Sequence, residues 1–410
     1  MQDLEGSAIR AVLKMTAGKN DLITFAGGLP ALSTLPVEFI NKTIDKALAE
    51  TPGLALQYGV TDGYSVLVER LQEKVKKMGM NLKENGVMVT SGGQQVIDLV
   101  ARSLLNEGDT VLCELPTFVG GLNVFKSYNA NVVGVKLEKD GINLEDLEQK
   151  LKENNVKLLY TIPTFHNPMG TTMTELKRKA ILALAHKYNF LIIEDNPYGE
   201  LRFGGEEVPT MKSLDAEGRV IYAGSFSKIL SPGLRVGFAV APKEVLDKMV
   251  VAKQVIDVHT TMLSQIVAAE FLAWDGYDAH IKNCCDLYGK KAKLMAEMCD
   301  KCFPEFITHT NPEGGIFMWC DIDKDVDTKE LLAKAVERKV AYIPGYTFMI
   351  DTDKPCNSFR LNYSVPTEED IVTGIEILGE VFKNLLFSSE GYKVLLKSIK
   401  IMVEEDMCLR

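Results

Sequence analysis

Short apolar runs alternate with longer amphipathic stretches over the first 245 residues of the chain. Runs of four to six apolar residues are typical of buried strands. They lie at 87–90, 111–114, 132–136, 158–162 and 191–195, in VIYAG from Val220, and at 236–241. The segments between most of these runs have the helical period. This alternation predicts an α/β fold with a mostly parallel sheet that helices cover on both sides.

The clearest helix is predicted in TTMTELKRKAILALAHKY. Thr172 and Glu175 have the spacing of a capping box, which favours a helix beginning at Thr172. At a period of 3.6 residues, one apolar face contains Leu176, Ala180, Ala183 and Leu184. In such a fold, ligands bind beyond the carboxyl ends of the strands.

The pattern changes after about residue 245. A long helical region is followed by the strand-like runs GGIFMWCDI, VAYIP and FRLNYS and by a helix from Thr367, which predicts a smaller α+β domain. We therefore expect an N-terminal arm and helix at 1–45 that pack with the small domain, a large domain at 46–280 and a small domain at 281–410.

Composition limits the classes of partner. The 410 residues have a formal net charge of −10 and no basic cluster, which argues against nucleic acid. No apolar run approaches the ~20 residues that span a bilayer, so we expect no membrane segment. Eight cysteines are few for this length and favour the reducing cytoplasm. Cys299 and Cys302 form a C-x-x-C without a matching second pair, so we expect buried thiols and no metal.

The stretch AGSFSKILSPGLRVGF contains two cations and no acid. Lys228 follows the run VIYAG by a few residues, where an open α/β sheet presents reactive groups. A lysine amine becomes nucleophilic when burial or a neighbouring cation lowers its pKa. Ser225, Ser227 and Arg235 supply donors suited to a phosphate. The alternative interpretation is a surface lysine in a polar loop.

A second anion site is predicted in VTSGGQQVIDLVARSL, where a strand, a glycine pair and a helix follow one another. The first amides of this helix, at Gly93 and Gln94, would point outward with the positive end of the helix dipole. A tight structural turn explains the glycine pair equally well. Together, two anion sites and a buried lysine suggest a phosphorylated aldehyde as the ligand.

Polar residues also follow two other predicted strands. Asp195 ends the apolar run LIIED, so its carboxylate could hold a pyridine nitrogen protonated. Tyr198, three residues on, could donate to a ring oxygen, and Asn167 holds a similar position in IPTFHNPMG. The alternative is that the aspartate and the Asn-Pro pair form ordinary turns.

Arg360 is predicted to bind an anion. In SFRLNYS, Phe359, Leu361 and Tyr363 alternate onto one face, which leaves Arg360 and Asn362 on the other. An arginine without a partner on that face needs an anion, unless it is a solvent-facing residue of an edge strand.

Taken in order, these motifs resemble the class I/II aminotransferases of PLP fold type I. The matching segments span about residues 20 to 385 and are QYG (57–59), SGGQQ (91–95), PTF (116–118), HNPMG (166–170), EDNPY (194–198), SFSKILSPGLRVG (225–237) and FRLNY (359–363). The resemblance implies the PLP-dependent transferase fold: a large domain with a mostly parallel sheet and a smaller α+β domain.

The resemblance also implies roles. Pyridoxal 5'-phosphate would be covalently bound to Lys228, the acid–base of the reaction, and Arg360 would bind the substrate α-carboxylate together with Asn167. Tyr58 would reach the cofactor phosphate of the neighbouring subunit in a homodimer. The other residues expected to bind the cofactor are Gly93, Gln94, Phe118, Asn167, Asp195, Tyr198, Ser225, Ser227 and Arg235.

The segments GSAIRAVLKM and TFAGGLP resemble the 2-aminoadipate and kynurenine aminotransferase branch. In that branch, an N-terminal helix closes over the substrate, which adds Arg10 and Gly28 to the expected substrate site; Arg10 could equally lie on an ordinary exposed helix. Phe118 stands where many relatives have tyrosine. The tail 388–410 extends beyond the family's usual last helix, and the sequence suggests no function for it.

We therefore expect a cytoplasmic, homodimeric aminotransferase that moves the amino group of an L-amino acid (2-aminoadipate, aromatic or branched aliphatic) to a 2-oxo acid, with 2-oxoglutarate as the expected acceptor. A PLP lyase of the same fold is the nearest chemical alternative. A ligand-sensing regulator of related fold is less favoured, because such regulators carry a basic winged-helix domain ahead of the PLP fold, and we expect no room for one here.

Overall fold

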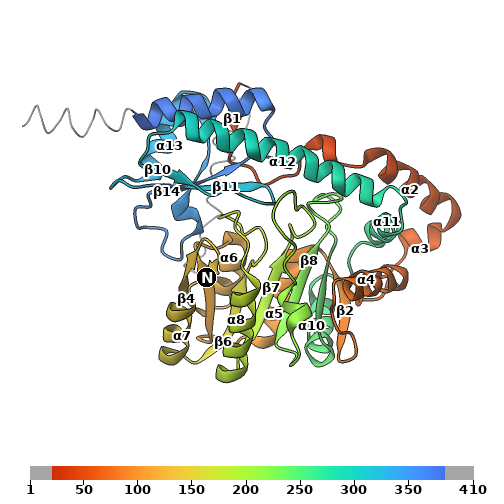
Figure 1. The fold of residues 1–410 in the computed structure, drawn as a ribbon. Helices are drawn as coiled ribbons and strands as arrows, with labels where there is room; N and C mark the ends of the chain where they lie inside the picture. Colours follow the sequence, from red (N-terminus) through yellow and green to blue (C-terminus); the bar gives the residue numbers. More distant parts are fainter. Residues whose placement is uncertain (1–20, 384–410) are drawn as a thin grey trace, which may run out of the picture.

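The computed structural model describes residues 21–383, and its centre is an eight-stranded sheet (Figure 1). Neighbouring strands are parallel, except that β9 is antiparallel to both β2 and β8, and β5 is antiparallel to β4. The strand order is β2 (Asn85–Thr90), β9 (Gly237–Pro242), β8 (Val220–Ser225), β7 (Leu191–Asn196), β6 (Val156–Thr161), β3 (Thr110–Leu115), β4 (Asn131–Glu138) and β5 (Gly141–Ile142). Each strand predicted before residue 245 lies in this sheet, which confirms the predicted α/β fold.

Helices cover both faces of the sheet because alternate strand residues form two separate apolar clusters. One face packs against α5 (Gly93–Leu104), α6 (Val119–Ser127) and α10 (Lys243–Ile256). The other packs against α7 (Leu144–Glu153), α8 (Glu175–Tyr188) and α9 (Met211–Leu214). Beyond them, α4 (Ser65–Lys77) covers the β2 edge.

A smaller antiparallel sheet lies above the carboxyl ends of the large sheet (Figure 1). It comprises β10 (Ile307–His309), β11 (Phe317–Ile322), β14 (Ser358–Asn362) and β13 (Ile343–Pro344). Helix α13 (Thr328–Glu337) and the helix at 368–383 accompany it. Thr367 caps the latter, because its Oγ1 accepts a hydrogen bond from Asp370 N at 3.0 Å.

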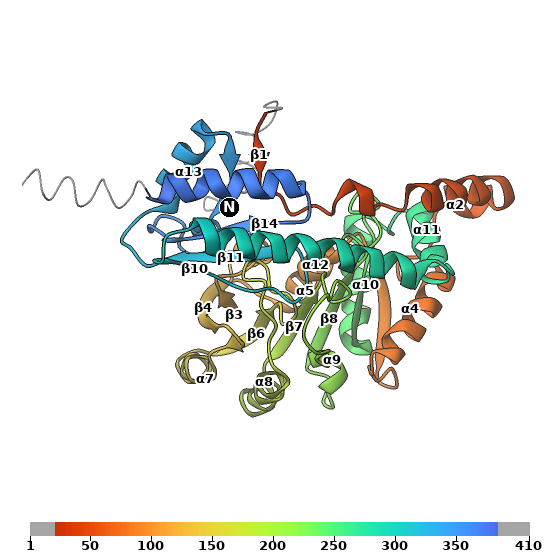
Figure 2. The same cartoon turned by 45° about the horizontal axis from the view of Figure 1, so that its top comes forward.

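Two segments connect the small sheet to the rest of the molecule. The long helix α12 (Tyr277–Cys302) runs from α11 (Met262–Leu272) across to the small sheet in both views (Figures 1 and 2). In the other direction, β1 (Ile23–Thr24) pairs in parallel with β12 (Val340–Ala341). Helix α2 (Val37–Glu50) lies instead beside α11, where Phe39 stacks on Trp274 with ring centroids 4.8 Å apart. The chain between β1 and α2 therefore runs from β12, beside the small sheet, to α11.

The start and the buried face predicted for α8 are both wrong. The helix begins at Glu175 after Thr174, so Thr172 and Glu175 form no capping box. Its buried residues are Arg178, Ile181 and Ala185, whereas Leu176 is 81% exposed. The cause is Arg178, whose guanidinium is fully buried and donates hydrogen bonds to the carbonyls of Met173, Pro163 and Pro209 and to Thr164 Oγ1. An apolar pattern could not assign an arginine to the core.

None of the helices within residues 21–383 has the length and apolar character that crossing a bilayer requires.

Candidate active site

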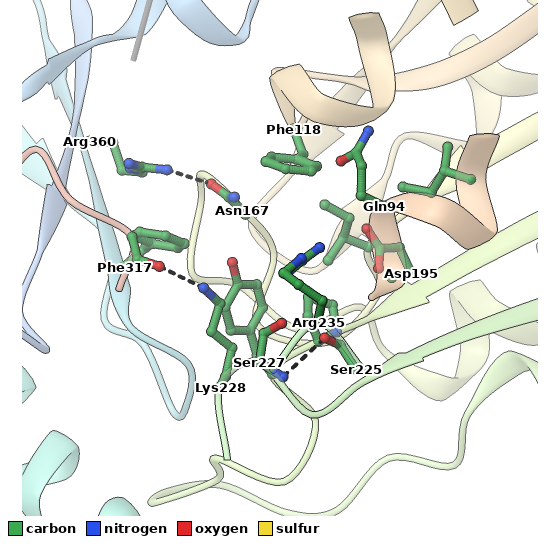
Figure 3. Close-up of a pocket in the computed structure, with 16 residues that line it drawn as sticks. Gln94, Phe118, Asn167, Asp195, Ser225, Ser227, Lys228, Arg235, Phe317 and Arg360 are labelled. Carbon is green, nitrogen blue, oxygen red and sulfur yellow. Dashed lines mark hydrogen bonds between the residues drawn. The ribbon is translucent and has the colours of Figure 1, made fainter. Parts of the chain in front are cut away.

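A cavity of about 290 Å³ lies where β6, β7 and β8 end and the small sheet begins (Figure 3). Figure 3 shows Arg360 and Asp195 on opposite sides of it, with Lys228 between them. The lining residues are Gly28, Gly93, Gln94, Ile97, Phe118, Ile162, Asn167, Asp195, Pro197, Tyr198, Ser225, Ser227, Lys228, Arg235, Phe317 and Arg360. The cavity thus lies at the carboxyl ends of parallel strands, as the α/β pattern predicts.

Lys228 lies in the loop after β8, and its amine points into the cavity (Figure 3). Its Nζ donates a hydrogen bond to the Gly28 carbonyl at 2.6 Å. Burial, together with the positive charges of Arg360 and Arg235, lowers the pKa of this amine to about 8. A substantial fraction of the amine is therefore neutral and nucleophilic near physiological pH.

The amino terminus of α5 forms an anion site with Arg235. Gly92 precedes the helix with φ = 89°, a conformation that favours glycine. A Cβ there would lie 2.5 Å from Arg235 Nη2, so glycine is also required for the close approach of the guanidinium. Among residues 21–383, no side chain caps α5, and its first turn contains no acid. Its first amides, Arg235 and Ser225 are thus placed to bind a phosphate.

A polar network around the buried Lys253 holds this anion site in place. Arg235 Nη2 donates to the Ser91 carbonyl at 3.1 Å, and Ser91 N donates to Gln95 Oε1 at 2.7 Å. Ser91 Oγ and Gln95 Nε2 each donate to Asp257 Oδ2 at 2.8 Å. Lys253, fully buried, donates to both Gln95 and Asp257. Sequence analysis missed this network because Asp257 is far from Ser91 along the chain.

Asp195, at the end of β7, is the acid of the cavity. Its side chain is 5% exposed, and its Oδ2 accepts a hydrogen bond from Tyr160 at 2.7 Å. Burial raises the pKa of the carboxyl to about 6, although the Tyr160 hydrogen bond opposes this shift. Tyr198 is also buried beside the cavity, and burial raises the pKa of its phenol. A cationic ring nitrogen would stabilise the ionised form of Asp195.

Arg360 projects from β14 into the opposite side of the cavity. Its guanidinium donates to Asn167 Oδ1 at 2.8 Å and to the carbonyls of Ala26 and Gly27 at 3.2 Å. Phe317 lies 4.0 Å from the guanidinium carbon, measured to the ring centroid. Arg360 Nε has no hydrogen-bond partner among the described residues, and burial lowers the pKa of the group to about 9. A buried arginine paired only with neutral groups suits a carboxylate ligand.

Phe118 and Gln94 form a third side of the cavity. Gln94 Nε2 donates to the Gly120 carbonyl at 2.8 Å, which joins the start of α5 to α6. A Cβ on Gly120 would lie 2.4 Å from the Phe118 ring, so a larger residue there would displace the ring. The ring faces the cavity in Figure 3 and provides an apolar surface for a planar ligand.

The structure brings together the predicted site residues, with two exceptions. Tyr58 is 81% exposed in the single chain and does not line the cavity. Arg10 lies outside the described residues 21–383.

Four lining residues were missed by sequence analysis: Ile97, Ile162, Pro197 and Phe317. Ile97 lies one helical turn beyond Gly93, so the helix period could have placed it. Phe317 pairs with Asn362, near Arg360, across two strands. This contact depends on strand register between segments more than forty residues apart, so the sequence pattern alone could not have found it.

These groups fit the phosphorylated pyridine aldehyde expected from the sequence. The uncapped amides of α5 and the guanidinium of Arg235 match a phosphate, and the amine of Lys228, with its lowered pKa, matches an aldehyde. Asp195 and Phe118 match a basic aromatic ring. Arg360 Nε remains available for a second anion, such as a substrate carboxylate.

Comparisons with known proteins agree with this chemistry. The family model described as "Aminotransferase class I and II" matches residues 21–378. The aromatic-amino-acid aminotransferase 1 of Thermococcus litoralis is 41% identical over 93% of this chain and 92% of its own length. The kynurenine aminotransferase of Pyrococcus horikoshii, solved in complex with PMP, has a TM-score of 0.90 and 39% identity over 94% of this chain and 96% of its own. The α-aminoadipate aminotransferase LysN of Thermus thermophilus, complexed with N-(5'-phosphopyridoxyl)-L-leucine, has a TM-score of 0.86 and 35% identity, with the same coverage of both chains.

Proposed function

The chain belongs to the class I and II aminotransferases, which act with pyridoxal 5'-phosphate, and from this premise we propose that it transfers the amino group of an L-amino acid to 2-oxoglutarate. One observation carries the assignment of residues: the Lys228 amine lies in one cavity with two anion-binding groups, the start of α5 with Arg235 and the guanidinium of Arg360. This arrangement matches a cofactor phosphate on one side of the amine and a substrate carboxylate on the other.

When bound, pyridoxal phosphate supplies an aldehyde carbon and an electron-withdrawing ring that makes the Cα proton of an amino acid removable. Lys228 would hold the cofactor and, once freed, would take the proton from Cα and return it to the former aldehyde carbon, two atoms away. A pKa of about 8 leaves its amine able both to accept and to donate at neutral pH. The phosphate would lie against Gly93, Gln94, Ser225, Ser227 and Arg235.

The remaining cavity residues would orient the ring and the substrate. Asp195 would bind the ring nitrogen and stabilise its positive charge, while Tyr198 and Asn167 would donate to the ring hydroxyl. Phe118 would cover one ring face. Arg360 would bind the α-carboxylate through Nε, which has no partner among the described residues, while Asn167 Oδ1 accepts from its Nη1 at 2.8 Å. The Gly28 carbonyl would lie next to the substrate amine, where Lys228 Nζ now meets it.

We propose aromatic amino acids and 2-aminoadipate as amino donors. The named relatives act on such donors, and Phe317 with Ile162 gives the cavity an apolar wall. Arg10, which lies outside the described residues, is the proposed partner of a distal carboxylate. A panel of donors with 2-oxoglutarate tests this. Arg10→Ala should lower kcat/KM roughly tenfold or more for 2-aminoadipate, the loss of one charge-assisted hydrogen bond, and leave phenylalanine unchanged. An equal loss of kcat/KM for both donors would show that Arg10 has a structural role and does not bind the distal carboxylate.

We also propose a homodimer in which Tyr58 reaches the partner's cofactor phosphate. The support is a surface of exposed apolar residues on two segments that meet where the rings of Tyr58 and His259 lie 5.8 Å apart. A surface of this kind is unusual on a monomer and typical of an interface. It contains Leu54, Leu56, Tyr58, Val60, Val251, Val255, Ile256 and Val258.

One experiment tests the catalytic lysine and the shared site together. Lys228→Ala should abolish transamination, and Tyr58→Ala should weaken it. In a refolded one-to-one mixture, hybrid dimers would contain one site with both residues intact, so about a quarter of the sites should recover. Activity no higher than the average of the two separate variants would contradict the shared site. Full activity of Lys228→Ala would contradict the role of the lysine.

A cytoplasmic location is part of the proposal. The cysteines within residues 21–383 are all free thiols, and six of these seven are buried. Free buried thiols suit a reducing compartment. Fractionation of cells followed by an activity assay would test this, and recovery outside the cytoplasm would contradict it.

A further inference from the structure

Tyr160 and Asp195 face each other from neighbouring parallel strands. Tyr160 on β6 pairs with Ile193 on β7, and Asp195 lies two residues further along. Because strand side chains alternate, Tyr160, Ile193 and Asp195 project from the same face of the sheet. The Tyr160 hydroxyl donates to Asp195 Oδ2 at 2.7 Å, and both groups are buried. Tyr160 does not line the cavity, so it contacts Asp195 from the side away from a ligand.

The phenol ring of Tyr160 is fixed by its neighbours on α6. A Cβ added to Gly121 would lie 2.7 Å from the ring, which therefore packs directly on the glycine backbone. Phe125 packs edge-to-face against it, with centroids 5.6 Å apart and an interplanar angle of 61°. The ring has no room to rotate away, so the hydroxyl stays on Asp195.

The other oxygen of Asp195 remains available to the cavity. Among the described residues, Oδ2 is the only oxygen of this carboxylate with a side-chain hydrogen bond. Oδ1 lies 3.9 Å from the position of a Cβ on Gly93, which itself lines the cavity. The carboxylate is thus held by one oxygen and presents the other.

The surroundings make the Tyr160 hydrogen bond the main local support for the ionised carboxylate. Burial raises the pKa of Asp195, and the negative charge of Glu114, on the opposite face of the sheet, raises it further. The nearby phenols of Tyr198 and Tyr222 are buried and stay neutral. Burial also raises the pKa of Tyr160 well above its usual value, so its hydroxyl remains a donor.

We propose that Tyr160 is a positioning residue for the ring nitrogen of the cofactor: its hydroxyl fixes Asp195 and keeps it ionised, so that the shared proton stays on the ring. The inference rests on the role proposed above for Asp195. Removing the hydroxyl would make the carboxylate more basic and shift the proton from the ring nitrogen to Asp195.

The test uses the holoenzyme loaded with pyridoxal phosphate labelled with ¹⁵N in the ring. In Tyr160→Phe, the ring resonance should move toward that of an unprotonated pyridine. The proton's preference for nitrogen over Asp195 should fall roughly tenfold to a hundredfold, the loss expected for one hydrogen bond to a charged group. The matched control is Tyr222→Phe, which removes another buried hydroxyl, bonded to Asn196 at 3.2 Å on the next strand. It should leave the resonance unchanged.

The outcomes separate the inference from the role of Asp195. A protonated ring in the wild-type enzyme that is equally protonated in Tyr160→Phe would overturn the inference alone. An unprotonated ring in the wild type would overturn the role of Asp195 and the inference with it.

A second measurement keeps the proposal testable if Tyr160→Phe does not fold. Replacing Tyr160 with 3-fluorotyrosine keeps the ring size but makes the phenol a stronger donor. In the full-length apoprotein, the ¹³C-labelled Asp195 carboxyl should then titrate at a lower pH than in the wild type. An unchanged or higher titration midpoint would refute the proposed action of the hydroxyl.

Discussion

Glu194 and Asp195 are consecutive acids at the end of β7, both buried, and they project to opposite faces of the central sheet. Glu194 lies among α8 and α9, where Oε1 accepts from Met211 N at 2.9 Å and Oε2 from Lys212 N at 2.7 Å. Arg178 Nη1 lies 3.9 Å from Oε1. Among the described residues, Asp195 instead accepts one side-chain hydrogen bond, from Tyr160, and it lines the cavity.

The difference separates a structural acid from a functional one. Both oxygens of Glu194 are bound by the protein, and a cation from α8 lies nearby, so it needs no ligand. Burial raises the pKa of both carboxyls, but only Asp195 lines the cavity, where a cationic ligand would stabilise its charge. An oxygen that has no hydrogen bond from a described side chain and belongs to a residue lining the cavity, more than burial itself, thus marks the acid of the site.

A substitution on the face of the central sheet that contains Glu194 should give the largest effect on stability. Arg178→Ala removes a buried guanidinium that donates to three carbonyls, and it leaves Glu194 without its cation. We expect the free energy of unfolding to fall by about 3–5 kcal/mol, the usual loss when one partner of a buried pair is removed. Denaturant unfolding measures this. The folded fraction should keep its kcat. A stable but inactive variant would contradict the assignment of stability to the Glu194 face and of catalysis to the Asp195 face.

Replacing each acid by its amide compares the two residues directly, because both variants remove a negative charge and keep the size of the side chain. Asp195→Asn should lower kcat about a hundredfold to a thousandfold, as for the loss of a preorganised charge. The folded-state pKa of Asp195 is raised to about 6, so its contribution to stability is present below pH 4 and lost as the pH rises through 6. At pH 8, the Asp195→Asn apoprotein should therefore be more stable than the wild type, by at most about 3 kcal/mol.

Glu194→Gln should behave in the opposite way. An amide has one acceptor oxygen, so its NH₂ group would face the N–H of Met211 or of Lys212, and stability should fall by about 1–3 kcal/mol with kcat unchanged. Thermal unfolding with and without cofactor, beside steady-state kinetics, distinguishes the two. If stability and kcat changed in the same way in both variants, the two acids would not have different roles.

Two lysines, the buried Lys212 and the half-buried Lys228, extend the comparison with a smaller effect. Lys212, beside Glu194, is paired with Asp215 at 3.0 Å, whereas Lys228 Nζ donates to the Gly28 carbonyl and forms no ion pair with a residue of 21–383. With a pKa of about 8, the reactive neutral amine of Lys228 should increase about tenfold per pH unit below pH 8 and level off above it. Borohydride trapping of pyridoxal phosphate on the apoprotein, followed by peptide mapping, should show this profile at Lys228. Labelling of Lys212 would contradict it.

The local sequence pattern predicted the structure correctly where a single strand or a single helix end determines the surroundings of a residue. The apolar runs before residue 245 all became strands of the large sheet; Asp195 ends one of these runs, and Lys228 and Asn167 follow two others. Gly92 and Gly93 could be placed at a helix start because a strand and a helix flank them. The pattern failed for α8, whose buried stripe is built around Arg178 and carbonyls from distant loops.

The α/β alternation, the loop that carries Lys228 and the family to which the motifs belong follow from the amino-acid order, because they depend on side-chain period and on residues close together in the chain. The packing of the folded chain, in contrast, fixes which of the two buried acids can bind a ligand. Glu194 and Asp195 are chemically alike and adjacent, and they differ in what β6, α8 and α9 bring to each face. It likewise decided that Tyr160 meets Asp195 and that Phe317 meets Arg360, since both contacts depend on strand pairing across long separations.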